Sequence, residues 1–201
     1  MYVWVHICTP PVMVPPLFTH AWPISWATDL HKMINCPYDN AFVAVRNKAA
    51  VIAAMSCKAP YLATGDQGSL ETVVPELQNS RRARGVVAYA ALQSLGREGL
   101  AALVDGCIER AARLVEIVVG NAMGRCRCVA TGFNQALLRF DESDEATAAV
   151  VKRVVEEGLV WFGCTNFRGI TVVRVSVVSW ATTDDDIDVA GDALIRALKE
   201  L

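Results

Sequence analysis

The sequence predicts an α/β fold, and three patterns support that prediction. Residues 80–95 and 100–118 carry apolar side chains at the three- and four-residue spacing of amphipathic helices. Residues 173–177 alternate between valine and polar side chains, which is typical of a half-buried strand. Two further helical patterns, at residues 144–157 and 187–201, lie on either side of that strand in the sequence. A chain of 201 residues, 53% of them hydrophobic, is long enough to bury a core.

The composition argues against several classes of protein. A net charge of −2 leaves no basic excess to neutralise phosphates, so we expect no nucleic-acid partner. No apolar run approaches the ~20 residues of a membrane-spanning helix, so we expect no membrane partner. The seven cysteines and three histidines lack the spacing of a zinc site, and Cys126 and Cys128 form the only close pair. We therefore expect reduced, buried cysteines, no metal site and a cytoplasmic location.

The first 28 residues differ from the rest of the chain. They contain no Asp, Glu, Lys or Arg, but hold five of the eight prolines and three of the five tryptophans. They lack the basic start and the uninterrupted apolar stretch of a signal peptide. We predict a divergent N-terminal segment at residues 1–28, a middle part with a loop and two long helices at 29–120, and an α/β small domain at 121–201.

The middle part contains one predicted strand and a helix with a defined end. Ala41–Arg46 is a short apolar run that ends in a polar residue, which predicts a buried strand. Ser80 is expected to open the first helix, and Gly96 to close it. Between these elements, residues 58–75 are rich in turn-forming residues and are predicted as a loop.

The small domain carries clear start and stop signals. Residues 133–140 are predicted as a strand. The helix at 144–157 has acidic residues in its first turn and Gly158 just beyond its end. Residues 183–186, Thr-Asp-Asp-Asp, predict a capping box at the start of the last helix.

Lys32 is the residue that first points to chemistry. It follows His31 in a mainly apolar run, ahead of the predicted buried strand. Desolvation in such a place favours a neutral, nucleophilic amine, which forms Schiff bases with aldehydes. The alternative is a partly exposed lysine on a turn, since most lysines lie at the surface.

The residues from Thr28 to Asp39, TDLHKMINCPYD, resemble the cofactor-lysine motif of the pyridoxal phosphate-dependent group II amino-acid decarboxylases. Ala59–Leu62 resembles the mobile catalytic loop of that family, and Phe167–Gly169 resembles part of its small-domain hairpin. The similarity runs in order from about Ser25 to the end of the chain. It implies part of a fold type I pyridoxal phosphate-dependent transferase, with a remnant of the large cofactor-binding domain at residues 29–120.

The resemblance implies a role for each matching residue. Lys32 would bind the cofactor, pyridoxal 5'-phosphate, covalently, and His31 would lie near the cofactor phosphate. Asp29 would help to seat the cofactor. Tyr61, on the mobile loop, would donate a proton after carbon dioxide leaves, a step that suits a positioned phenol on a closing lid.

Four arginines allow more than one interpretation. Arg81, Arg82 and Arg84 are consistent with a solvated basic face of a helix, or with contacts to a phosphate or a dimer partner. Arg174 invites comparison with the substrate-binding arginine of aminotransferases, but we favour pairing with an acid of the small domain.

The match to the family departs from its pattern near the start of the chain. Trp4–Ile7 resembles the strand that ends in an aspartate facing the pyridine nitrogen, but Cys8 follows here. A thiol cannot hold the pyridinium proton that makes the ring an electron sink. We therefore expect the C-terminal half of a decarboxylase with a divergent or misjoined N-terminus. Such a chain should expose apolar surface within residues 25–60 and associate as a homodimer.

Three functions are consistent with these residues. The first is decarboxylation of a small-molecule L-amino acid with pyridoxal 5'-phosphate, with impaired turnover in this chain. The second is an inactive remnant that keeps the dimer and small-domain scaffold. The third is an aminotransferase or aldolase on the same fold, although the TDLHK motif followed by NCPYD favours a decarboxylase.

Overall fold

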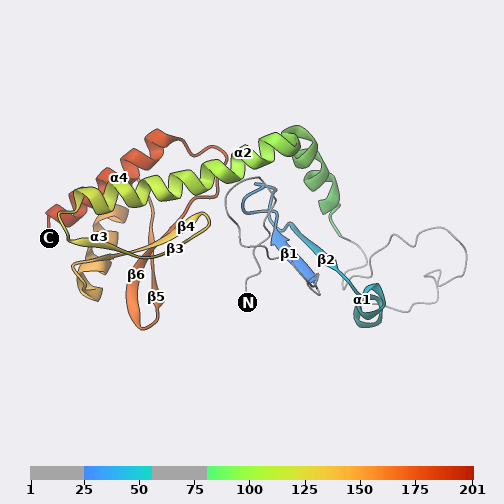
Figure 1. Ribbon diagram of the computed structural model, residues 1–201, viewed down its shortest axis with the longest axis horizontal. Coiled ribbons are helices and arrows are strands. Elements are labelled where there is room, and N and C mark those ends of the chain that lie inside the picture. Colours follow the sequence, from blue (N-terminus) through green and yellow to red (C-terminus); the bar gives the residue numbers. More distant parts are fainter. Residues whose placement is uncertain (1–24, 56–80) are drawn as a thin grey trace, which may run out of the picture. The chain divides into compact units, whose positions relative to one another are not determined.

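The computed structural model describes residues 25–55 and 81–201, and the chain divides into two compact units (Figure 1). The C-terminal unit consists of Lys32–Asn35 and Leu95–Leu201. The described part of the N-terminal unit consists of residues 25–31, 36–55 and 81–94. The division into residues 1–28, 29–120 and 121–201 stays a prediction.

The N-terminal unit contains an antiparallel hairpin of β1, Ser25–Asp29, and β2, Ala41–Val45. The short helix α1, Lys48–Met55, follows. The strand at β2 was predicted as buried, and this is wrong, because Phe42 is 54% exposed and Val43 is 62% exposed. The expectation of exposed apolar surface within residues 25–60 is confirmed at this strand.

The helix α2, Arg84–Asn121, is interrupted where the sequence predicted an end. Gly96 has φ 62° and ψ −171°, a left-handed φ that glycine adopts without a Cβ clash. The first helix begins at Arg84 and not at Ser80, which lies outside the described residues. After the interruption, α2 buries one stripe of side chains: Leu100, Cys107, Ala111, Leu114 and Val118.

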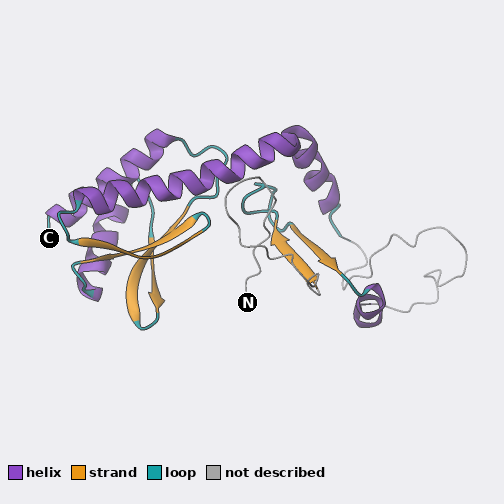
Figure 2. Cartoon of the chain, in the orientation of Figure 1, coloured by secondary structure: helices purple, strands orange, loops and turns teal. Residues whose placement is uncertain are grey.

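The C-terminal unit contains a four-stranded antiparallel sheet in the order β3-β4-β6-β5 (Figure 2). The strands are β3, Cys126–Gly132; β4, Gln135–Phe140; β5, Gly163–Phe167; and β6, Ile170–Ser176. The two central strands, β4 and β6, match the predicted ones. The predicted start of β4 at Phe133 was too early, because Phe133 has φ 55° and lies in the turn between β3 and β4.

The two C-terminal helices have the predicted caps. In α3, Asp144–Glu157, the Ser143 hydroxyl accepts a hydrogen bond from the Ala146 N–H, and Gly158 ends the helix with φ 76°. In α4, Asp184–Lys199, Thr183 and Asp186 form the predicted capping box. Both helices therefore begin and end where local sequence chemistry favours it.

The core of the C-terminal unit lies between one face of the sheet and the three helices. Leu138 on β4 pairs in register with Val173 on β6, so their side chains lie on the same face, and both are fully buried. The helices contribute Leu114 from α2, Val150 from α3 and Leu194 from α4 to this same core. The predicted packing of helices on one face of a short sheet is thus confirmed, and the bounds of the small domain, residues 121–201, stay a prediction.

The helices α2 and α4 run side by side over this core (Figure 1). Their approach is close at Gly191, where an added Cβ would lie 2.6 Å from Cγ2 of Ile117. Ion pairs flank this contact: Arg110 Nε lies 2.9 Å from Asp184 Oδ1, and Arg113 Nη2 lies 2.8 Å from Asp188 Oδ1. A small residue at position 191 therefore sets the spacing of the two helices.

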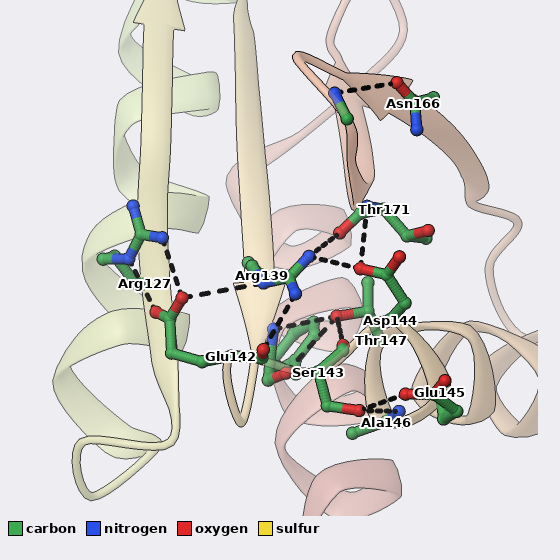
Figure 3. A network of polar contacts seen from close by, with 12 residues as sticks. Arg127, Arg139, Glu142, Ser143, Asp144, Glu145, Ala146, Thr147, Asn166 and Thr171 are labelled. Atoms are coloured by element: carbon green, nitrogen blue, oxygen red, sulfur yellow. Dashed lines mark hydrogen bonds and ion pairs between the residues drawn. The ribbon is translucent and has the colours of Figure 1, made fainter.

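A buried arginine ties the sheet to the start of α3 (Figure 3). Arg139 donates hydrogen bonds to the carbonyls of Glu142 and Thr171, at 2.8 and 2.9 Å. It also donates to Asp144 Oδ1 at 2.6 Å, and that oxygen accepts a further hydrogen bond from the Thr171 N–H. These contacts join β4, α3 and β6 at one corner and satisfy the guanidinium, as a buried charge requires.

Candidate functional site

The residues that connect β1 to β2, residues 30–40, are called the lysine loop below. The loop is closed at its base, where the Cys36 N–H donates to the Leu30 carbonyl at 3.0 Å, and both side chains are buried. Lys32–Asn35 belong to the C-terminal unit, and the other residues of the loop to the N-terminal unit. Its position directly between two paired strands restricts its backbone on both sides.

His31 is held by the end of its own loop. Its backbone N–H and its ring Nδ1 both donate to the Asn40 carbonyl, at 3.1 and 2.9 Å. Since that carbonyl can only accept, Nδ1 carries a proton, and Nε2 carries one only in the imidazolium form. Nε2 lies 3.9 Å from Asp29 Oδ2, and the ring lies against Tyr38 with centroids 4.1 Å apart. The structure thus brings two of the predicted site residues, Asp29 and His31, together.

Asn40 and Arg84 fix the second half of the loop. The buried Asn40 side chain donates to the Arg84 carbonyl at 3.1 Å. Arg84 in turn forms a two-pronged ion pair with Asp39, at 3.1 Å from Nε to Oδ1 and 2.6 Å from Nη2 to Oδ2. The hydrogen bond from Arg84 lowers the pKa of Asp39 to about 2. Arg82 donates to the Tyr38 carbonyl at 3.0 Å.

These contacts add to the sequence interpretation of the arginines. Arg82 is exposed, as a solvated side chain would be, but it precedes the helix, whereas Arg84 is half-buried. Both donate to residues of the lysine loop. Arg174, expected to pair with an acid, donates instead to the side-chain oxygen of Gln135 at 3.1 Å.

Lys32 lies in a turn of the loop, with its side chain exposed. The turn is closed by a hydrogen bond of 3.0 Å from the Asn35 N–H to the Lys32 carbonyl. The burial that the sequence argument used to explain a reactive amine is therefore absent, and the turn location matches the alternative reading. An exposed amine is nevertheless accessible to an aldehyde from solution.

The donor set suits pyridoxal 5'-phosphate in part. The exposed primary amine of Lys32 can bind the aldehyde, and the half-buried imidazole of the preceding residue is a cationic donor for a phosphate when protonated. Tyr61 and Cys8 lie outside the described residues. Among the described residues, no group of three or more His, Cys, Asp or Glu side chains is arranged to hold a metal ion.

The cysteines of the described part of the chain are free thiols. Cys36, Cys107 and Cys126 are buried, as expected, and burial raises the pKa of Cys126 to about 12. Cys164 is exposed on β5, contrary to the expectation of burial. In the same regions, no helix is long and apolar enough to span a membrane.

Sequence reasoning missed the residues that support the lysine loop. Asn35 and Asp39 were read as part of a motif with no role assigned to either, and Asn40, just beyond the motif, was not singled out. Asn35 has φ 55°, a conformation in which asparagine is enriched, so its presence after Lys32 was a usable turn signal. The partners of Asn40 and Asp39 lie more than 40 residues away, and no local pattern reveals them.

Comparison with known proteins decides the family. Residues 15–127, more than half of the chain, match the family model described as the pyridoxal-dependent decarboxylase conserved domain. The chain belongs to the pyridoxal-dependent decarboxylase family. The match includes the whole lysine loop and the whole of α2. No curated protein sequence matches the chain.

Solved structures of decarboxylases share the fold. Oryza sativa TDC, crystallised with PLP and tryptamine, is 19% identical with a TM-score of 0.78, over 88% of this chain and 39% of that one. Catharanthus roseus tryptophan decarboxylase, in complex with L-tryptophan, is 19% identical with a TM-score of 0.75, over 88% and 38%. Mouse CSAD is 17% identical with a TM-score of 0.73, over 89% and 40%.

These similarities identify part of the fold type I architecture. At such identities they establish the fold alone. The chain spans about two fifths of the length of each of these structures. The expected fold class is therefore confirmed.

Proposed function

We propose that this chain is a pyridoxal 5'-phosphate-dependent decarboxylase of an L-amino acid, with low turnover. The observation that carries the proposal is the position of Lys32 in the family's matched region. Its side chain is exposed, while the residues on both sides of it are held by hydrogen bonds. A fixed backbone with an accessible amine is what a covalent cofactor site needs.

Each residue of the site would have a separate role. Lys32 would hold the cofactor, His31 would face its phosphate, and Asp29, whose carboxylate lies near His31, would orient the imidazole. When bound, the cofactor supplies the electron sink for cleavage of the bond to the carboxyl group. Tyr61 would donate the proton that replaces carbon dioxide.

Low turnover is proposed because of Cys8. The resemblance puts an aspartate at this position, and a neutral thiol cannot stabilise a protonated pyridine nitrogen. The same observation favours the second candidate, an inactive scaffold. The aminotransferase alternative loses support, because the matched family is one of decarboxylases.

The proposal also includes a small-molecule amino-acid substrate, assembly as a homodimer and a cytoplasmic location. The exposed apolar side chains of β2 support self-association, here as a homodimer. The free cysteines of the described residues support a reducing, cytoplasmic location. A basic nucleic-acid-binding surface is not expected at a net charge of −2.

The test is an assay of carbon dioxide release from a panel of L-amino acids with added pyridoxal 5'-phosphate. We expect slow release that Lys32→Ala abolishes and that Lys152→Ala, which removes an exposed amine on α3, leaves unchanged. Cys8→Asp should raise the rate. Release that survives Lys32→Ala would overturn the proposal. Cofactor binding at Lys32 without any release, in the chain and in Cys8→Asp, would favour the scaffold.

A further inference from the structure

Residues Lys32–Asn35 are called the lysine turn below. One contact in the C-terminal unit links this turn to a distant part of the chain. The Asn35 side-chain nitrogen donates to the Val178 carbonyl at 2.9 Å, across 143 positions in sequence. It also donates to the Met33 carbonyl at 2.9 Å, inside the turn itself. The Asn35 side-chain oxygen lies 3.4 Å from the Trp180 N–H, which donates to it. Both ends of the amide are therefore used.

The backbone of Asn35 adds a second constraint. Its φ of 55° is in the left-handed region, which asparagine and glycine tolerate better than other residues. An aspartate tolerates that φ as well, but it cannot donate to two carbonyls. Glycine keeps the backbone and removes the amide. Substitutions at this position can therefore test the backbone conformation and the side-chain amide separately.

The segment that receives Asn35 is itself firmly held. Val177 is buried in the core of the C-terminal unit, and its N–H donates to the Asn134 carbonyl at 3.1 Å. The Asn134 side chain, 1% exposed, donates back to the Val177 carbonyl at 2.6 Å. Met33, from the lysine turn, packs against the same core. The turn is therefore anchored to the core of the unit.

We infer that Asn35 is a positioning residue for Lys32, which acts by fastening the lysine turn to the segment after β6. The inference rests on the proposed cofactor role of Lys32. It gives a specific reason why the position of Lys32 is fixed: the side-chain amide of Asn35 holds the lysine turn against the rest of the C-terminal unit. Nothing in the local sequence around Lys32 requires such a contact.

The experiment compares cofactor capture by different lysines of the whole chain. The chain is incubated with pyridoxal 5'-phosphate and reduced with borohydride, and the label on Lys32 is measured relative to Lys152, which is exposed on α3. In the unchanged chain, the label should favour Lys32. Asn35→Gly should lower the Lys32-to-Lys152 ratio about tenfold, because it removes the three side-chain hydrogen bonds of Asn35, each of which contributes only a modest net free energy. Asn35→Asp should lower it at least as much.

A matched control removes a similar contact elsewhere in the same unit. Asn166 accepts a hydrogen bond from the Gly169 N–H at 3.1 Å in the turn between β5 and β6 (Figure 3). Asn166→Gly should leave the labelling ratio unchanged. Trace acetylation of Lys32, which needs access but no defined position, should be the same in all variants.

The outcomes separate this inference from the proposed function. Equal labelling of the two lysines in the unchanged chain would overturn the proposed function. Preferential labelling that persists in Asn35→Gly would overturn the positioning role alone. Amide hydrogen exchange is a readout independent of the cofactor: Asn35→Gly should speed exchange at residue 35 and at Trp180. Unchanged exchange at both would overturn the inference even where no cofactor binds.

Discussion

The described parts of the two units bury their apolar side chains to very different extents. In the C-terminal unit, Leu138, Phe140 and Val173 are completely buried between the sheet and three helices. In the N-terminal unit, Phe42 and Val43 of β2 are 54% and 62% exposed. The hydrophobic effect therefore stabilises the C-terminal unit far more strongly than the described part of the N-terminal unit. The lysine loop has residues in both units, and its turn, Lys32–Asn35, belongs to the better-packed one.

The largest expected effect is that of a substitution in the core of the C-terminal unit. Leu138→Ala removes a buried side chain and leaves a cavity, so the free energy of unfolding should fall by about 3 kcal/mol. Phe42→Ala, at an exposed position of β2, should change it by less than about 0.5 kcal/mol. Chemical denaturation of both variants measures the difference. Equal losses would show that β2 is covered in solution and that the contrast is wrong.

Two glycines provide a second, smaller comparison. Gly191→Ala places a Cβ against Ile117 and should destabilise the C-terminal unit by about 2 kcal/mol through overpacking. Gly85→Ala, in the first turn of α2, meets no atom within 4 Å and should stabilise the chain by up to about 1 kcal/mol. Thermal unfolding distinguishes the two directions. A stabilising Gly191→Ala would contradict the close packing of α2 against α4.

The smallest expected effect concerns the exposed ion pair of the lysine loop. The pKa of Asp39 is lowered to about 2 by Arg84, so the pair's contribution to folding is complete above the ordinary value of 3.8 and is lost as the pH falls toward 2. Arg84→Met should return the pKa of Asp39 toward its ordinary value. A carbon-detected NMR titration of the carboxyl group measures both. A titration near 3.8 in the unchanged chain would show that the pair does not form.

The sequence allowed the central elements of the C-terminal unit to be predicted, and the reasons are local. The caps of α3 and α4 depend on residues within four positions of one another, such as Thr183 and Asp186. The central strands β4 and β6 carry strong apolar signals because both are covered. The edge strands β3 and β5 were not predicted, since edge strands are half-exposed and their patterns are mixed.

The candidate site could be predicted only where it follows a motif. Lys32, His31 and Asp29 lie in one short segment, which the resemblance identified as a unit. Arg84 and Val178 hold the lysine loop through Asp39 and Asn35, respectively. Both lie far along the chain from the motif, so only the folded chain shows these contacts. Of the two alternatives for Lys32, the structure shows the exposed lysine on a turn. An apolar run indicates that burial is favourable, but folding decides which of its residues lie in a turn.

The central claim is that Lys32 is the lysine that carries pyridoxal 5'-phosphate. Peptide mapping of the borohydride-reduced complex tests it most directly, because the reduced bond marks the lysine that held the cofactor. We predict one label per chain on the Lys32 peptide, lost in Lys32→Arg and kept in Lys152→Arg. A label spread evenly over the five lysines, or one that survives Lys32→Arg, would contradict the claim.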